Sequence, residues 1–160
     1  METEAYTGRG DPGSHAFPGP RVRNLPMFGP PGRAYVYRCH LWPLLNVVTD
    51  REGRPGAVLI RALVPVAGLA HMRRRRSTAE LRDFTRGPGR LAQALGVTVA
   101  HNRADLLRGP LRLLRPARPV RLTVRRTTRI GLRGPAALLP WRYVAINNEF
   151  VSTGITPAVS

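Results

Sequence analysis

The sequence contains no lysine, so all 26 of its basic residues are arginines. Without a lysine amine the chain cannot form a lysine Schiff base with an aldehyde such as an opened abasic sugar, and only the N-terminal amine could take that role. The single cysteine, Cys39, excludes an internal disulfide, and Cys39 and the four histidines lack the spacing of a zinc site. We therefore expect no metal site and no cofactor.

Long apolar runs are also missing. No stretch approaches the roughly 18 residues that a membrane helix needs, and the first residues have neither the basic nor the apolar region of a secretory signal. We expect a cytoplasmic protein with no membrane partner.

Glycine and proline number 16 each in 160 residues, which favours short elements and many loops. We expect one domain over residues 1–160, with a tail from about residue 153.

Acidic residues are scarce. Nine acids against 26 arginines leave a net charge of +17, which points to a polyanionic partner. The guanidinium of arginine forms bidentate hydrogen bonds with phosphates and guanine edges, and it stacks on bases. A surface rich in arginine therefore suits a nucleic-acid partner. A compositional bias could explain the replacement of lysine, but it does not explain the excess of positive charge. The run Arg73–Arg76 is a solvated charge run or a phosphate contact.

Short elements can be placed from the local patterns. Residues 7–32, rich in glycine, proline and arginine, are typical of a long functional loop. β-Rich runs at 34–38, 44–49 and 56–64 predict an antiparallel core, and further strands are predicted at 120–125, with an arginine-bearing outer face, and at 141–146. A helix is predicted to start at Ser77, with Glu80 completing a capping box, and another at 90–95, between Pro88 and Gly96.

The first six residues, METEAY, place Glu2, Glu4 and Tyr6 on one face if the segment is extended, because side chains alternate along a strand. An acid and an aromatic ring would then line one wall of a pocket. The alternative is an exposed edge strand with two solvated glutamates and a half-buried tyrosine, since buried unpaired carboxylates are uncommon.

The order of the motifs resembles that of the alkylpurine (3-methyladenine) DNA glycosylase family from Glu2 to Ser152. The matching blocks are ETEAY, DxxSH (Asp11–His15), RN..MFGPPG..YVY (Arg23–Tyr37), LNVV, AVLIRA, GPGRLAQALG, RIG (Arg129–Gly131), PWRY and FVS. The resemblance implies a monofunctional base-excision repair enzyme that flips an alkylated or deaminated purine out of duplex DNA and hydrolyses its N-glycosidic bond. The expected fold is a single α+β domain, with a curved, mainly antiparallel sheet and a few short helices, which acts as a monomer.

The resemblance also assigns roles to individual residues. Glu4 takes the catalytic position, where a carboxylate activates water and stabilises an oxocarbenium-like transition state, and Glu2 matches the motif's non-catalytic acid. Arg61 matches the arginine that holds Glu4, although a strand-end arginine bound to a surface acid would look the same. Tyr6, His15 and Tyr37 match the residues that sandwich the flipped base, and Asn46 the one that penalises guanine.

Two features depart from the family pattern. Relatives carry an additional N-terminal segment before ETEAY, so the chain resembles an N-terminally truncated member and we expect Glu4 to lie on a fraying terminus. The family's YGMH-like stretch, whose tyrosine wedges into the vacated DNA stack, is one residue shorter here, which leaves His40, Leu41 and Trp42 as wedge candidates. Trp42 could instead pack into the core. The alternative functions are a non-catalytic DNA- or RNA-binding remnant and a basic ribosome-associated protein.

Overall fold

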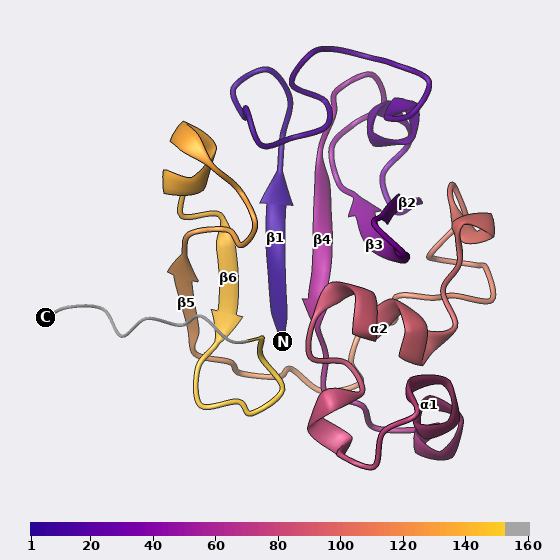
Figure 1. Cartoon of the computed structure of the whole chain (residues 1–160). Helices are drawn as coiled ribbons and strands as arrows, with labels where there is room; N and C mark the ends of the chain where they lie inside the picture. The colour runs from indigo at the N-terminus through magenta and orange to yellow at the C-terminus, as the bar shows by residue number, and fades with distance from the viewer. Residues whose placement is uncertain (153–160) are drawn as a thin grey trace, which may run out of the picture.

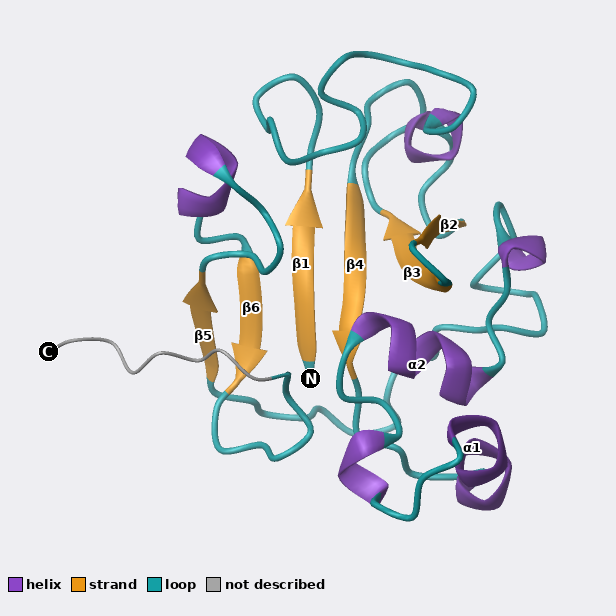
Figure 2. Cartoon of the chain, in the orientation of Figure 1, coloured by secondary structure: helices purple, strands orange, loops and turns teal. Residues whose placement is uncertain are grey.

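The computed structural model describes residues 1–152, so the tail expected from about residue 153 lies outside the described residues. Six strands form one sheet in the order β2-β3-β4-β1-β6-β5, and every neighbouring pair is antiparallel (Figures 1 and 2). The strands are β1 (Glu2–Tyr6), β2 (Ala34–Cys39), β3 (Trp42–Val48), β4 (Ala57–Ala62), β5 (Val124–Thr127) and β6 (Arg142–Ala145). The helices are α1 (Leu69–Arg76) and α2 (Pro88–Leu95), with 3-10 turns η1 (Leu25–Phe28), η2 (Leu81–Asp83), η3 (Val99–His101) and η4 (Gly134–Leu138). The predicted α+β class with an antiparallel sheet is confirmed.

The first strand lies inside the sheet, between β4 and β6. Glu4 is opposite Leu59 on one side and Arg142 on the other, and the carbonyl oxygen of Met1 accepts a hydrogen bond from the Ala145 amide at 2.9 Å. The edge-strand alternative and the expectation of a fraying Glu4 are therefore both wrong. The reason is β6, which lies about 140 residues further along the chain. It pairs with the side of β1 that would otherwise be an open edge of the sheet.

Helix α2 packs against β3 and β4 (Figure 2). Leu91, Ala92 and Ala94 are its buried residues, and Ala92 joins the core cluster of Val36 and Leu45. Pro88 begins the helix, and Gly96 ends it in the left-handed conformation at φ 70°. The helix predicted at 90–95 is confirmed.

The helix predicted to start at Ser77 is wrong. Ser77 instead closes α1, because it adopts the left-handed conformation at φ 49° and its amide donates to the carbonyl oxygen of Arg73. Helix α1 buries none of its residues. Arginines tie it to α2, with Arg75 donating to the Ala94 carbonyl at 3.0 Å and Arg76 donating to Gln93. Half of the run Arg73–Arg76 thus makes contacts within the protein.

The strand predicted at 120–125 begins later, at Val124. Its partner β6 has only four residues, so only four residues of β5 can pair with it. The pairing runs from Val124 opposite Ala145 to Thr127 opposite Arg142. Residues 112–123 belong to no helix or strand. The other predicted strands agree with the structure to within two residues at each end. Within residues 1–152, no helix has both the length and the apolar character needed to cross a membrane.

Candidate active site

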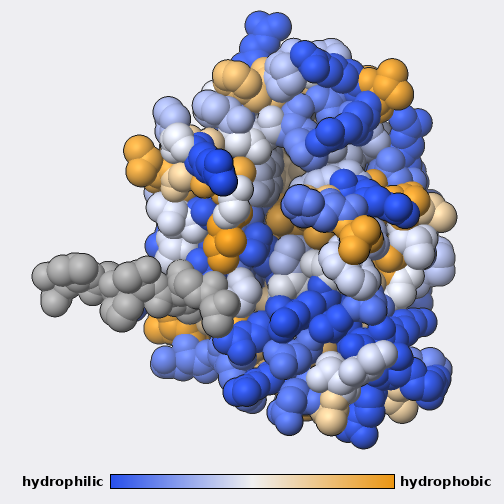
Figure 3. All heavy atoms as spheres, in the orientation of Figure 1, coloured by the Kyte–Doolittle hydropathy of each residue, from blue (hydrophilic) through white to orange (hydrophobic). Residues whose placement is uncertain are grey.

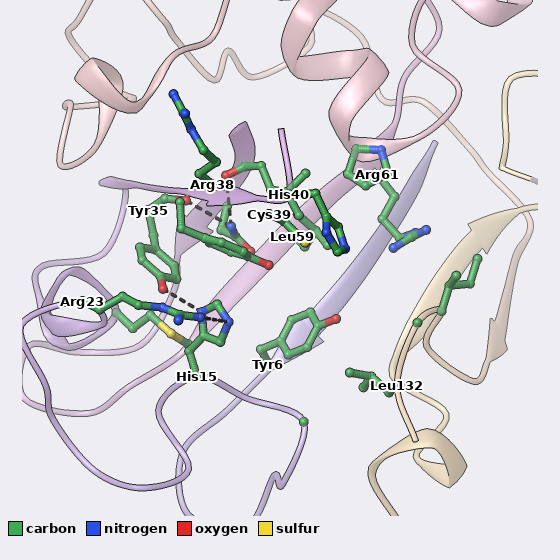
Figure 4. Close-up of a pocket in the computed structure, with 18 residues that line it drawn as sticks. Tyr6, His15, Arg23, Tyr35, Arg38, Cys39, His40, Leu59, Arg61 and Leu132 are labelled. Carbon is green, nitrogen blue, oxygen red and sulfur yellow. Dashed lines mark hydrogen bonds between the residues drawn. The ribbon is translucent and has the colours of Figure 1, made fainter. Parts of the chain in front are cut away.

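A cavity of about 480 Å³ lies over β1–β4, on the face opposite α2 (Figure 4). Six residues predicted from the sequence line it, namely Tyr6, His15, Tyr37, His40, Asn46 and Arg61. Glu4 lies beneath the lining and is fully buried, with hydrogen bonds to three of the lining residues. Ile130, Gly131 and Leu132, which follow β5, close the side opposite β2. The structure therefore brings these residues together around one cavity, whereas the wedge candidates Leu41 and Trp42 lie outside its lining.

Three rings form the aromatic wall of the cavity. The His15 and Tyr37 ring centroids are 4.5 Å apart at 66°, and those of Tyr35 and Tyr37 are 5.3 Å apart at 34°. Tyr35 belongs to the YVY motif, but nothing in the sequence distinguished its role from that of a core residue. Burial raises the pKa of Tyr35 to about 12, so its hydroxyl keeps its proton.

Arg23 and Tyr35 fix the orientation of the His15 ring. Arg23 donates to Nε2 of His15 at 2.9 Å, and Nδ1 lies 2.8 Å from the Tyr35 hydroxyl. Because a guanidinium can only donate, Nε2 is the acceptor and Nδ1 carries the proton of the neutral ring. Burial and the charge of Arg23 both lower the pKa of His15, which keeps the ring neutral at pH 7.

The Glu4 carboxylate faces three hydrogen-bond donors. Its Oε2 accepts from the Tyr6 hydroxyl at 2.8 Å and from Arg61 at 3.2 Å, and its Oε1 accepts from the Ile130 amide at 2.8 Å. Burial and the neighbouring Glu4 charge raise the pKa of Tyr6, so the tyrosine remains a donor. These contacts fix the carboxylate in one orientation under the cavity.

Arg61 connects the two buried glutamates. Its Nε donates to Glu2 Oε1 at 2.9 Å while its other end holds Glu4. Both carboxylates are fully buried, so the reading of Arg61 as a partner of a surface acid is wrong. Arg142 and Ser152 complete the surroundings of Glu2 at 2.7 and 2.6 Å. Sequence reasoning missed both, since each lies at least 140 residues from Glu2 and leaves no local pattern.

The surroundings of Glu2 predict a loss of stability in acid. Burial alone would raise its pKa, but the hydrogen bonds from Ser152 and Arg142 outweigh burial and leave the pKa of Glu2 below its usual 4.5. The unfolded chain then binds the proton more tightly, so this contribution is present above pH 4.5 and is lost as the pH falls below it. Urea midpoints measured from pH 7 to pH 3 should fall more steeply in the unmodified chain than in Glu2→Gln. Equal slopes in that window would contradict the assignment.

A second buried ion pair lies behind Tyr6. Arg129 donates to both oxygens of Asp11, at 2.7 and 2.6 Å, and to the Ala5 carbonyl at 2.9 Å, and both side chains are fully buried. The Arg129 guanidinium lies 4.5 Å from the centroid of the Tyr6 ring. Asp11 also accepts hydrogen bonds from the backbone amides of Thr7 and Gly13. Gly13 lies two residues before His15 in the sequence. Asp11 belongs to the DxxSH motif and Arg129 to the RIG motif, but no local pattern indicates that they pair.

The wedge candidates occupy the tip of the β2–β3 hairpin. His40 is in the left-handed conformation at φ 52° and lines the cavity (Figure 4). Leu41 is 80% exposed. Trp42 is 45% exposed and packs against Gly89 of α2, where a Cβ atom would lie 3.0 Å from that of Trp42. The alternative that Trp42 packs into the core is wrong. Leu41 and Trp42 line a separate groove of about 430 Å³.

Within residues 1–152, no three His, Cys, Asp or Glu side chains gather as metal ligands. The groups that define the site are an aromatic cavity, a fixed carboxylate beneath it and an arginine-rich exterior, which Figure 3 shows as hydrophilic side chains over the lower part of one face. Fold and site thus define an α+β protein with an aromatic cavity above a buried acid, and its excess of arginine suits a nucleic-acid partner.

Comparison with known proteins is more specific. The sequence profile of the methylpurine-DNA glycosylase (MPG) family matches residues 1–149, and the chain belongs to this family. A relative from Rhodopseudomonas palustris (strain BisB18) is 51% identical over 154 residues, which cover 95% of this chain and 74% of the relative. One from Methanoculleus marisnigri is 46% identical over 156 residues, which cover 95% and 80%. Both are named "Putative 3-methyladenine DNA glycosylase". The resemblance seen in the sequence is confirmed, and the family is one of DNA glycosylases, repair enzymes whose substrate is DNA.

Proposed function

We propose that this chain flips a damaged purine out of duplex DNA and hydrolyses its N-glycosidic bond, leaving an abasic site. The observation that carries the proposal is the Glu4 carboxylate, fully buried beneath an aromatic cavity and held by three donors. A carboxylate so placed can orient water and accept its proton while its charge stabilises an oxocarbenium-like transition state. The absence of lysine removes a lysine Schiff base as an alternative and favours water as the nucleophile.

The aromatic wall suits a purine with an alkyl group on a ring nitrogen. Such a base carries a positive charge, which favours stacking on the electron-rich ring of Tyr37 in this wall and on that of Tyr6, which also lines the cavity. His15 is neutral at pH 7, so it adds no repulsion to the charged base. The cavity of about 480 Å³ is within the usual range for sites that enclose a small ligand. Alkylated adenine and deaminated adenine are the substrates we propose, and the names of the relatives agree with the first.

Asn46 provides a means to reject guanine. Its side-chain nitrogen donates to the Tyr35 carbonyl at 3.0 Å, and the residue is 3% exposed, so the amide cannot move aside. A rigid amide at the cavity wall leaves no room for the exocyclic amine that distinguishes guanine from adenine and hypoxanthine. We therefore keep Asn46 as the residue that penalises guanine.

The release of damaged bases tests the proposed function directly. Labelled duplexes carrying 3-methyladenine or hypoxanthine are incubated with excess protein, and free base is measured in a single turnover. Release from the lesion duplex, with none from undamaged DNA, supports the proposal. A folded chain that binds duplex DNA without releasing either base would overturn it and favour the non-catalytic binding alternative.

For the wedge we propose His40, because its side chain lines the cavity that the flipped base would enter, whereas Leu41 does not. His40→Gly suits the left-handed backbone and removes the side chain, so the fold should persist. Since unstacking a base step takes a few kcal/mol, we expect the flipped population to fall by about 10-fold or more. Fluorescence of 2-aminopurine placed beside the lesion measures it. A larger loss in Leu41→Ala would move the assignment to Leu41.

A further inference from the structure

The segment that joins η3 to β5 carries a regular pattern of arginines. Residues 106–148 contain ten arginines and no acid, and four of these arginines, Arg112, Arg115, Arg118 and Arg121, recur at every third position. Pro116 lies between the second and third of them and Pro119 between the third and fourth. We call residues 112–123 the arginine strap.

The strap lies on the surface and bends at residues 117 and 118. Its residues belong to no helix or strand, and each residue from 112 to 126 is exposed. In Figure 1 the strap passes across the end of the sheet at which β1 begins and then enters β5. Even its leucines are outside the core, with Leu113 47% and Leu114 76% exposed. Packing within the chain therefore does not explain why the strap has this sequence.

The spacing of the arginines presents them as a row. An extended proline-rich chain has about three residues per turn, so side chains three apart point to the same side. Arg121 lies nine positions after Arg112, which gives a reach of at most about 30 Å. This reach approaches the roughly 34 Å of one helical turn of DNA.

The four arginines are not engaged by carboxylates. Arg61, Arg129 and Arg142 are held by buried acids, whereas no ion pair in the part of the chain that the structure describes involves a strap arginine. A guanidinium in water binds phosphate oxygens bidentately and releases the counterions of the phosphate. The row therefore offers several such contacts to one backbone.

We propose that the arginine strap binds the phosphate backbone of duplex DNA, as a surface separate from the base cavity. The choice of duplex DNA rests on the proposed function, while the polyanion itself follows from the charge and exposure of the strap. Because phosphate contacts carry no sequence information, the strap should contribute affinity and salt dependence without selecting the lesion.

The test compares two charge-matched triple variants on undamaged duplex DNA. One carries Arg115→Gln, Arg118→Gln and Arg121→Gln. The control replaces Arg9, Arg51 and Arg54 by glutamine, because these exposed arginines belong to the loops at the opposite end of β1 and β4. Binding of a labelled duplex is measured by fluorescence anisotropy from 50 to 300 mM salt. Since each phosphate contact contributes about 0.9 to the slope of log affinity against log salt, the strap variant should lower the slope by about 2 to 3.

A change in slope below about 1, or an equal change in the control variant, would overturn the proposal. A strap variant that loses affinity for a structured RNA hairpin but not for duplex DNA would also overturn it, in favour of an RNA partner. Thermal melting shows that each variant is folded. Binding to undamaged DNA requires no base excision. Phosphate binding by the strap can therefore be confirmed even if the chain releases no base and the proposed function fails.

Discussion

Glu4→Gln is expected to lower the single-turnover rate of damaged-base release by about 10²- to 10⁴-fold, the usual contribution of a positioned general base. Glutamine has the same shape, but it is neutral and cannot take a proton from water. Its one oxygen can still accept from Arg61 and Tyr6, and the contact with the Ile130 amide is lost because the NH2 group cannot accept, so the fold should persist with a small loss of stability. The rate of release from a duplex carrying 3-methyladenine or hypoxanthine measures the effect.

Glu52→Gln is the matched control for Glu4→Gln. Glu52 lies exposed in the β3–β4 turn, away from the cavity, and its loss should leave the rate of release unchanged. The affinity of Glu4→Gln for lesion DNA should stay close to that of the unmodified chain. A Glu4→Gln variant that still releases base at more than about a tenth of the original rate would remove Glu4 from the role of general base.

Local pattern predicted which side chains of the first strand share a face, whereas the roles of the site residues came from the family resemblance. Alternation in ETEAY places Glu2, Glu4 and Tyr6 on one face, and the structure confirms it, because Arg61 contacts both acids and Tyr6 contacts Glu4. Pro88 and Gly96 likewise mark the ends of α2, since each residue acts on the backbone conformation at its own position. Where a single residue or a period of two determines the structure, the sequence alone is informative.

Contacts between distant segments could not be predicted in this way. Whether β1 is an edge strand or an inner strand depends on β6, and the fully buried state of Glu2 depends on Arg142 and Ser152. Neither relation has a local signature. Ser77 shows the limit even at short range, because the same serine can begin one helix or end another, and the backbone conformation that decides between them is visible in the structure alone.

Loss of the ion pair behind Tyr6 should weaken both stability and excision. Arg129→Met leaves the Asp11 carboxylate buried without its partner, and breaking a buried pair in this way costs about 3–5 kcal/mol. Arg129 is followed by Ile130, whose amide holds Glu4, and its guanidinium supports the Tyr6 ring. Displacement of these groups by about 1 Å should slow base release by about 100-fold. Urea unfolding and single-turnover release measure the two effects separately.

Combining Arg129→Met with Asp11→Asn separates positioning from stability. The double variant contains neither buried charge, so most of the lost stability should return, as when a buried ion pair is replaced on both sides. The support for the Ile130 amide and the Tyr6 ring is still missing, so we expect base release to stay slow, with affinity for undamaged duplex unchanged. Arg129→Lys, which keeps the charge opposite Asp11, should recover part of the rate. A double variant that recovers stability and rate together would show that the pair acts through folding alone and that the position of Glu4 does not depend on it.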